Sequence, residues 1–270
     1  MTGSGTQQSP YIPEDWDELK TACETEGAYV ALNPGTEWDM NDQYPEDTPQ
    51  ISFKCMELDG RSAKIKNIRK SSGSLFGLGQ ATHAVKLLNL NFESMYITDA
   101  TMFYAISYSW YDANAIELIG VRIGAELYDA KFWDCDNQGV TTDQSSIALY
   151  VSNSNIGNNP KELKNTVIDI NGTVTDGIGG NSGLNLNCSA LYGSVRAVNS
   201  QQGVSLGGKL SVVDITLQNF SVIYFGSTET TNVINISTIG DAEVSGTVIQ
   251  ATAAQLKDAA WLNAAGFPCA

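Results

Sequence analysis

The sequence predicts an all-β protein that folds as a parallel β-helix-like solenoid. Three observations lead to this prediction. Short runs of alternating apolar and polar residues recur along most of the chain, the segments between them are rich in Asn, Gly, Asp and Ser, and helical periodicity is confined to the two ends. With 270 residues, the chain is long enough for one large β domain.

Each alternating run would bury every second side chain, so no run can build a core alone. Parallel strands usually need helical crossovers, and this chain shows no helical pattern between its ends. Coiling the chain so that successive runs stack in register solves both problems, and Asn residues at the bends can then form ladders of side-chain hydrogen bonds. The runs are Val85–Phe92, Ala115–Ile123, Ile147–Val151, Thr166–Val174, Gly183–Leu191, Leu210–Phe220 and Asn232–Ile239.

The alternative fold is an antiparallel sandwich or jelly roll. Such folds prefer two-residue hairpin turns such as Asn-Gly, and only Asn171-Gly172 offers one. The tetrapeptide Leu-Asn-Leu-Asn occurs at both 88–91 and 184–187. The runs recur about every 17 to 31 residues, near the range of structural repeats, and these signals favour the solenoid.

The chain is expected to divide into a flexible or docking arm, a β-helix domain, and a C-terminal capping helix with a tail. The bounds of these regions are 1–12, 13–251 and 252–270. A solenoid exposes core and strand edges at its ends, so a helix is expected over each end. The first helix, at 13–26, has an apolar stripe made of Trp16, Leu19, Ala22 and Cys23. The second, at 252–265, starts at a capping box of Thr252 and Gln255.

The composition narrows the class of partner. A net charge of −15 argues against nucleic acid and anionic membranes, and favours cationic surfaces, divalent cations or neutral glycans. The sequence contains no run of eighteen apolar residues, which is the length that a membrane-spanning helix needs. The five cysteines are widely spaced and His83 is the only histidine, so we expect reduced, buried thiols and no cofactor or metal centre.

The charges are unevenly distributed. Residues 1–60 carry thirteen acidic side chains, whereas residues 61–70 carry five of the fifteen basic ones. The basic segment is either an exposed edge or a docking patch for the acidic 14–47 region of a neighbouring copy. Under the second interpretation, the interface residues in this segment are Arg61, Lys64, Lys66 and Arg69.

The most apolar stretch is an aromatic run at 102–111. It is interpreted either as core with a stacked aromatic surface or as a subunit interface, where Tyr and Trp are enriched. Interface residues expected here and in the C-terminal segment are Tyr104, Tyr108, Trp110, Tyr111, Trp261 and Phe267.

Candidate catalytic residues are few. Asp134 and Asp136 would share one face of a strand about 6.6 Å apart, a spacing that overlaps those of glycosidase carboxylates, and Trp133 could stack on a sugar. A polar turn after a strand is the favoured interpretation, because acid pairs are common in acidic chains. A Ca²⁺ site is a second weak candidate, but its loop lacks the EF-hand spacing and a solvated loop is favoured. Its carboxylates would be Asp39, Asp42 and Asp47.

Three motifs near the N-terminus are Trp16-x-x-Leu19-x-x-Ala22, Val30-Ala31-Leu32-Asn33-Pro34-Gly35 and Leu58-Asp59-Gly60. Together they make residues 13–70 resemble the start of pectate-lyase-like right-handed β-helices. This resemblance implies a right-handed coil with a helix capping its first rung. The segment 256–268 is similar to the ends of tailed-bacteriophage virion proteins.

These resemblances imply a phage appendage, such as a capsid decoration protein, head fibre or tail spike, and such proteins are commonly homotrimers. We therefore expect a non-enzymatic virion structural protein, made in the bacterial host cytoplasm. Its expected partners are copies of itself, other virion proteins and host surface glycans. The alternatives are a carbohydrate-active β-helix enzyme and a glycan-binding recognition protein, because fold alone does not assign function.

Overall fold

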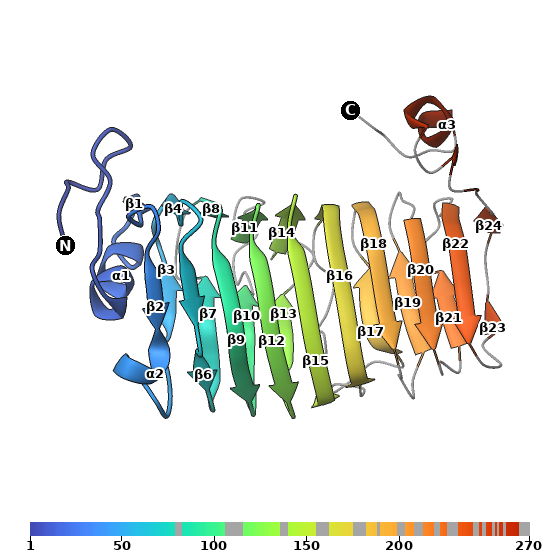
Figure 1. Cartoon of the computed structure of the whole chain (residues 1–270), viewed down its shortest axis with the longest axis horizontal. Coiled ribbons are helices and arrows are strands. Elements are labelled where there is room, and N and C mark those ends of the chain that lie inside the picture. Colours follow the sequence, from blue (N-terminus) through green and yellow to red (C-terminus); the bar gives the residue numbers. More distant parts are fainter. Residues whose placement is uncertain are drawn as a thin grey trace.

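Successive stretches of the chain lie side by side as parallel strands in the computed structural model, and they coil into a β-solenoid (Figure 1). The predicted all-β parallel solenoid is thereby confirmed. The structure describes residues 1–78, 83–105, 116–135, 140–154, 162–174, 182–187, 190–198, 203–207, 213–218, 222–225, 232–239, 243–244, 247–249, 252, 254–255 and 258–264. Between residues 162 and 249 the description covers the backbone and the side chain of Thr166.

Three sides of the coil are distinguished by the strands that stack on them. The first side contains β1 (Tyr29–Ala31), β4 (Glu57–Asp59), β8 (Val85–Leu88), β11 (Ile116–Ile119) and β14 (Val140–Asp143). The second side contains β2 (Glu37–Asp39), β5 (Lys64–Lys66), β6 (Arg69–Lys70), β9 (Asn91–Thr98), β12 (Arg122–Tyr128) and β15 (Ser146–Ser154). The third side contains β3 (Ile51–Phe53), β7 (Gly73–Leu78), β10 (Ala100–Ala105) and β13 (Lys131–Cys135).

The coil continues beyond these strands. The long strand β16 (Glu162–Val174) pairs with both β14 and β15, so it joins the first and second sides in one strand. The second side then extends through β18 (Ala190–Val198), β20 (Val213–Gln218), β22 (Asn232–Ile239) and β24 (Thr247–Ile249). A separate parallel sheet is formed by β17 (Ser182–Asn187), β19 (Gly203–Gly207), β21 (Val222–Phe225) and β23 (Glu243–Val244).

The coil is right-handed. As the chain advances from left to right in Figure 1, the strands of the second side in front run downward and those of the third side behind run upward. The strands also stay in register from one turn to the next. One row of partners on the second side consists of Glu37, Lys64, Asn91, Arg122 and Ser146.

The core forms because alternate residues point inward on the first and second sides, whereas on the third side adjacent residues such as Met102 and Phe103 are both buried. In β8, Val85 and Leu87 are fully buried, whereas Lys86 between them is exposed. Aromatic rings line the interior along the coil axis, and Phe76 of β7 is at their centre. Its ring centroid lies 5.7 Å from that of Phe53 and 5.3 Å from that of Phe103. Such contacts add specific geometry to the burial of apolar area.

Residues in the left-handed conformation form the bend between the first and second sides. Asn89, Gly120 and Gln144 have φ of 51°, 65° and 49°, and each follows a strand residue that is in register with the others. Asn89 Nδ2 donates to Asp59 Oδ1 at 3.2 Å, which is one bond of the expected side-chain ladder. The ladder does not extend to Gly120, where a Cβ would lie only 3.0 Å from Asn89 Oδ1.

The N-terminal end of the coil is closed by α1 (Trp16–Cys23). All four residues of the expected stripe are buried, which confirms the amphipathic helix, although it is shorter than the predicted 13–26. Asp15 caps it by accepting a hydrogen bond from the Glu18 backbone at 2.8 Å. Trp16 packs on Phe76, with ring centroids 6.3 Å apart, and its Nε1 donates to the Pro49 carbonyl at 3.0 Å. A second short helix, α2 (Met40–Gln43), follows β2.

Residues 1–12 dock onto their own chain. The Tyr11 backbone donates to Tyr29 O and accepts from Ala31 N, both at 2.9 Å, so Tyr11 adds a parallel bridge beside β1. Thr2 and Ile12 form an antiparallel bridge that folds the arm back on itself. The arm thus covers a strand edge that would otherwise be open to pairing with another chain.

The C-terminal helix α3 (Ala259–Ala264) is shorter than the predicted helix at 252–265. The expected capping box is present, because Thr252 N donates to Gln255 Oε1 at 2.9 Å and Gln255 N donates to Thr252 Oγ1 at 3.2 Å. The helix stands away from the last strands in Figure 1, and its described side chains are exposed except for half-buried Trp261. A capping role for α3 therefore stays a prediction. No helix among the described residues is long and apolar enough to cross a membrane.

Candidate functional site

The outer surface of the second side carries a bulge on β9. Glu93 and Ser94 both point outward between the buried residues Phe92 and Met95, and Ser94 has φ of 55°. The register between β9 and β12 shifts at this point. Bulges of this kind re-aim side chains and break the regular surface of a sheet.

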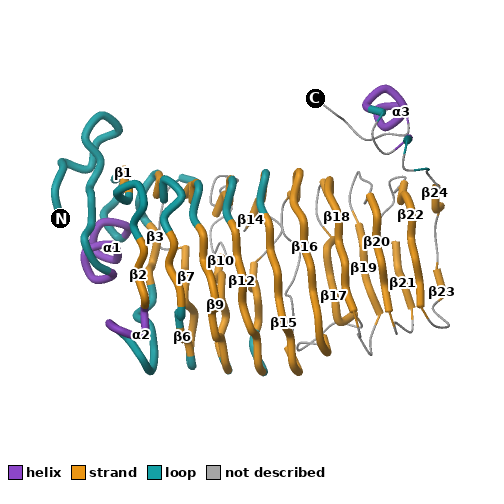
Figure 2. The backbone as a smooth tube through the Cα atoms, viewed as in Figure 1, coloured by secondary structure: helices purple, strands orange, loops and turns teal. Residues whose placement is uncertain are grey.

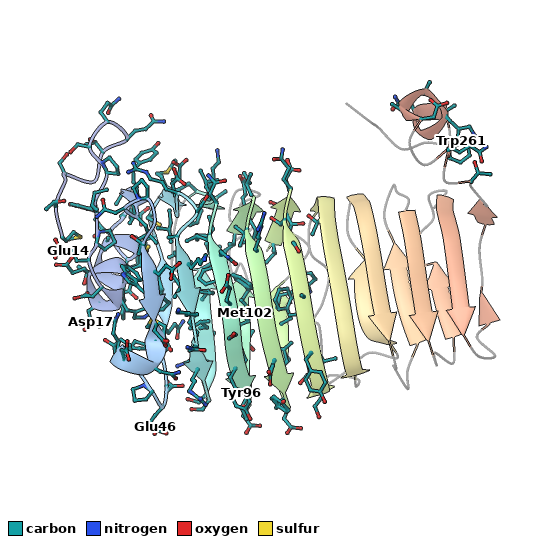
Figure 3. The ribbon with its side chains drawn as sticks, viewed as in Figure 1. Glu14, Asp17, Glu46, Tyr96, Met102 and Trp261 are labelled. Carbon is teal, nitrogen blue, oxygen red and sulfur yellow. The ribbon has the colours of Figure 1, made fainter. Side chains whose placement is uncertain are left out.

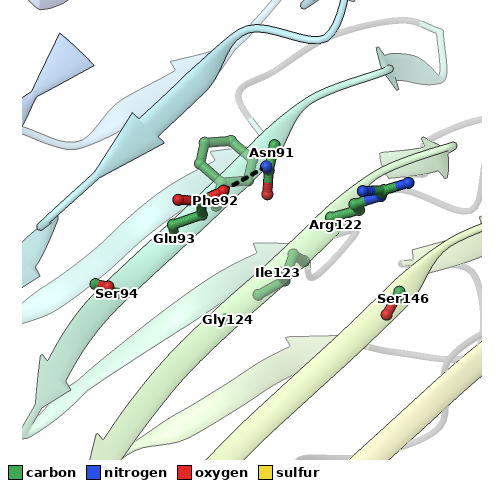
Figure 4. Close-up of a pocket in the computed structure, with 8 residues that line it drawn as sticks. All are labelled: Asn91, Phe92, Glu93, Ser94, Arg122, Ile123, Gly124 and Ser146. Carbon is green, nitrogen blue, oxygen red and sulfur yellow. Dashed lines mark hydrogen bonds between the residues drawn. The ribbon is translucent and has the colours of Figure 1, made fainter. Parts of the chain in front are cut away.

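Opposite the bulge, Gly124 leaves an open hollow of about 390 Å³ (Figure 4). The lining residues are Asn91, Phe92, Glu93, Ser94, Arg122, Ile123, Gly124 and Ser146. A Cβ at position 124 would lie 3.8 Å from the Phe92 carbonyl oxygen, which is ordinary contact, so a side chain fits there and would fill the hollow. A second hollow of about 340 Å³ shares Asn91 and Arg122 and extends the first toward Lys64.

The hollow offers several polar groups. Asn91 Nδ2 donates to Glu93 Oε1 at 2.6 Å, which fixes an amide and a carboxylate side by side. Arg122 is exposed and forms no ion pair with any described residue. Lys64 Nζ lies 3.1 Å from Glu37 Oε1, and this contact raises the pKa of Lys64. Hydrogen-bond donors and acceptors are therefore available for a polar ligand.

A row of tyrosines crosses the same surface beside the hollow. The ring centroids of Tyr96 and Tyr128 are 5.0 Å apart, and those of Tyr128 and Tyr150 are 6.0 Å apart. Tyr96 and Tyr150 are 39% and 46% exposed, and Tyr96 stands at the rim of the coil in Figure 3. Arg69 lies over the Tyr96 ring at 5.7 Å. The Tyr128 hydroxyl donates to Glu126 at 2.9 Å, and this bond raises the pKa of Tyr128.

The basic segment at 61–70 meets the acidic region of its own chain. Strand β5 lies in register on β2, with Lys64 opposite Glu37 and Lys66 opposite Asp39. Arg69 Nε donates to Asn41 Oδ1 at 3.4 Å. The basic segment is thus partly paired within its own chain, and docking between copies through this segment stays a prediction.

Lys70 makes the most buried of these contacts. Its side chain is 7% exposed, and its Nζ donates to Asp47 Oδ2 at 2.6 Å and to Thr48 O at 3.1 Å. Asp47 Oδ1 also accepts from the Ser71 backbone at 2.8 Å. Burial raises the pKa of Asp47, but the hydrogen bonds from Lys70 and Ser71 outweigh burial, so this pKa lies below its ordinary value.

The other expected interface residues are widely separated. Tyr104 is half-buried on β10, and Trp261 is half-buried in α3. Arg61 is exposed in a bend, with its Nε 4.0 Å from Asp59. Tyr108, Trp110, Tyr111 and Phe267 lie outside the described residues. The interface made from these positions stays a prediction.

The structure describes one of the two candidate catalytic carboxylates. Asp134 accepts a hydrogen bond from Lys131 Nζ at 2.8 Å, and Asp136 lies outside the described residues. Trp133 is fully buried, so the idea that it stacks on a sugar is wrong. Phe132 and Trp133 are both buried, with ring centroids 4.8 Å apart, so β13 lacks the usual alternation of buried and exposed residues, as β10 does.

The calcium candidates do not gather into a site. Asp39 caps α2 and accepts from Asn67 Nδ2 at 2.8 Å, and these bonds lower the pKa of Asp39. Asp47 pairs with Lys70, and Asp42 is exposed. In the described part of the chain no group of three or more His, Cys, Asp or Glu side chains could hold a metal ion.

The tyrosine row and the hollow were not found by sequence reasoning. A signal for the row was present, because Tyr96 and Tyr150 each stand between two apolar residues in an alternating run and therefore had to point outward. Comparison with known proteins gives no further assignment: no protein-family model, no curated protein and no solved structure matches this chain.

We predict that Asp47→Asn lowers the free energy of unfolding by about 1–3 kcal/mol at pH 7, because buried Lys70 loses its counter-charge. Asp47 itself is partly exposed, which keeps the effect below that of a fully buried pair. The pKa of this carboxyl is lowered by folding, so its contribution is present above the unfolded pKa of about 3.9 and is lost as the pH falls through the folded value. Urea denaturation at pH 7 and pH 3 measures both effects.

The matched control is Asp42→Asn, which removes an exposed carboxylate from the nearby helix α2 and should leave the free energy of unfolding within about 0.5 kcal/mol. A difference between Asp47→Asn and the natural chain that is equal at pH 7 and pH 3 would contradict the pairing.

Proposed function

We propose that this chain is a non-enzymatic structural protein of a bacteriophage virion, in which a stiff solenoid presents one side to its surroundings. The observation that carries the proposal is the unbroken parallel pairing on the second side, which extends the coil as an elongated body from β2 to β24 (Figure 2). Each turn of a solenoid contacts only its neighbours, so length can be added without enlarging the core. This property suits a spacer or appendage.

The use of the carboxylates supports a structural role. Asp39, Asp47 and Asp134 all accept hydrogen bonds from neighbouring side chains of their own chain. Groups held in this way stabilise the coil and are poorly placed for proton transfer to a substrate. We propose the location on a virion from the resemblance of segment 256–268 to the ends of phage virion proteins.

We expect the chain to assemble into a homotrimer. Light scattering coupled to size-exclusion chromatography should give a discrete mass of three times the 29.0 kDa chain. Antibody labelling of phage particles in electron micrographs then tests the location. A monomer at all concentrations, together with unlabelled particles, would sink the proposal.

A second candidate function is glycan binding on the outer surface of the second side, and the exposed tyrosine row beside the hollow favours it. Sugars stack their apolar faces on aromatic rings, and their hydroxyls need donors and acceptors such as Asn91, Glu93 and Arg122. The solenoid is acidic overall, so neutral glycans fit better than anionic ones.

We predict that Tyr96→Ala combined with Tyr150→Ala weakens glycan binding at least tenfold, which corresponds to about 1.4 kcal/mol. Gly124→Leu should weaken binding as well, because it fills the hollow without strain on the backbone. An array of bacterial surface polysaccharides identifies the ligand, and calorimetry with that polysaccharide measures the affinity. Lys86→Ala is the control, since it removes an exposed side chain from the first side.

Absence of binding across neutral and anionic polysaccharides would rule out this second function. Binding that survives both the tyrosine and the Gly124 variants would place the glycan elsewhere on the chain.

A further inference from the structure

Cys23 and Cys55 lie next to each other inside the N-terminal cap. Cys23 is the last residue of α1, and Cys55 lies between β3 and β4. The backbone N–H groups of Lys54 and Cys55 donate to the Cys23 carbonyl at 2.9 and 3.0 Å. A direct backbone hydrogen bond keeps the two residues close, and the hydrogen bond between their side chains brings the two sulfur atoms together, as a disulfide requires.

The two thiols are free and fully buried. Burial, and after it the hydrogen bond with Cys55, raises the pKa of the Cys23 thiol well above its ordinary value. The thiolate is the reactive form, so Cys23 is protected from oxidants while the cap is closed. The expected burial is confirmed for these two cysteines, and their reduced state stays a prediction.

We propose that Cys23 and Cys55 are a latent disulfide site, which an oxidising environment converts into a covalent clamp on the N-terminal cap. The backbone hydrogen bonds already hold the two residues next to each other in the closed cap, so the cap has to open only to admit the oxidant. A structural protein that leaves a reducing cytoplasm meets such an environment outside the cell.

The position of the proposed disulfide determines which part of the fold it would stabilise. The bond would tie the end of α1 to the start of the second turn, and the loop it closes contains β1, β2, α2 and β3. This first turn has a neighbouring turn on one side only, so it is a place from which the stack can open. Closing this loop restricts the unfolded chain and holds the helix over the core.

The reaction is thiol–disulfide exchange with a small-molecule disulfide such as oxidised glutathione. The thiolate of one cysteine attacks the glutathione disulfide, which releases one glutathione thiol and leaves a mixed disulfide. The other cysteine loses its proton and displaces the second glutathione. The glutathione S–S bond breaks, the Cys23–Cys55 bond forms, and two glutathione thiols carry away the two electrons and two protons.

The test uses the full chain with Cys135, Cys188 and Cys269 replaced by Ser, so that only the pair remains. This chain is oxidised with glutathione disulfide in mildly denaturing urea, returned to buffer and digested without reduction. Mass spectrometry should find one peptide pair linked through Cys23 and Cys55, which dithiothreitol separates. The oxidised chain should have a Tm about 5 °C above that of the same chain reduced.

Comparing the two redox states of one chain removes any stability effect of the Ser substitutions. Cys55→Ala in this background is the matched control, and its Tm should not rise on oxidation. Recovery of both cysteines as separate glutathione adducts or as free thiols would overturn the proposal. A linked chain with an equal or lower Tm would also overturn it, because the clamp would then not stabilise the cap.

Discussion

The in-register stacking of parallel strands is the constraint on which the rest of the structure depends. No turn of the coil buries its apolar side chains without the next, so the rings of Phe53, Phe76 and Phe103 form a core only because their strands align. The same constraint makes the ends vulnerable, and this explains why Trp16 closes the aromatic stack and why residues 1–12 cover the edge of β1. The cysteine pair lies at this closed end, where the proposed disulfide would oppose opening of the cap.

Register also determines what the outer surface presents. Strand alternation points tyrosines from three successive turns outward, and their rings meet although Tyr128 is offset by two residues from the register of the other two. The bulge at Ser94 and the missing side chain at Gly124 break this regular surface and open the hollow. Register likewise places Lys64 on Glu37, so the acidic first turn is partly neutralised by the second turn. A stiff scaffold and a binding surface thus arise from one repeat pattern.

Much of this fold could be predicted from the sequence, because alternation in runs such as Val85–Phe92 fixes which side chains point inward. The buried face of α1 could also be predicted, because its apolar residues recur at helical spacing. The bulge at Ser94 was not, since a single residue of extra length leaves no local signature. The pairing of Lys70 with Asp47 and the row through Tyr96 were also missed, because turns of unequal length hide which residues become neighbours. The prediction that Trp133 stacks on a sugar was wrong because two adjacent residues of β13 are both buried, which regular strand alternation does not predict.

The register can be measured directly between two exposed positions, Glu37 and Ser146, which are four strand spacings apart in one row. At about 4.8 Å per spacing, their Cα atoms are about 19 Å apart. Nitroxide labels on Glu37→Cys and Ser146→Cys, in a chain whose Cys135, Cys188 and Cys269 are Ser, report this distance by pulsed electron–electron double resonance. A parallel coil in this register predicts one narrow distribution near 20 Å. A distribution centred beyond about 35 Å, or one without a defined maximum, would contradict the stacked register.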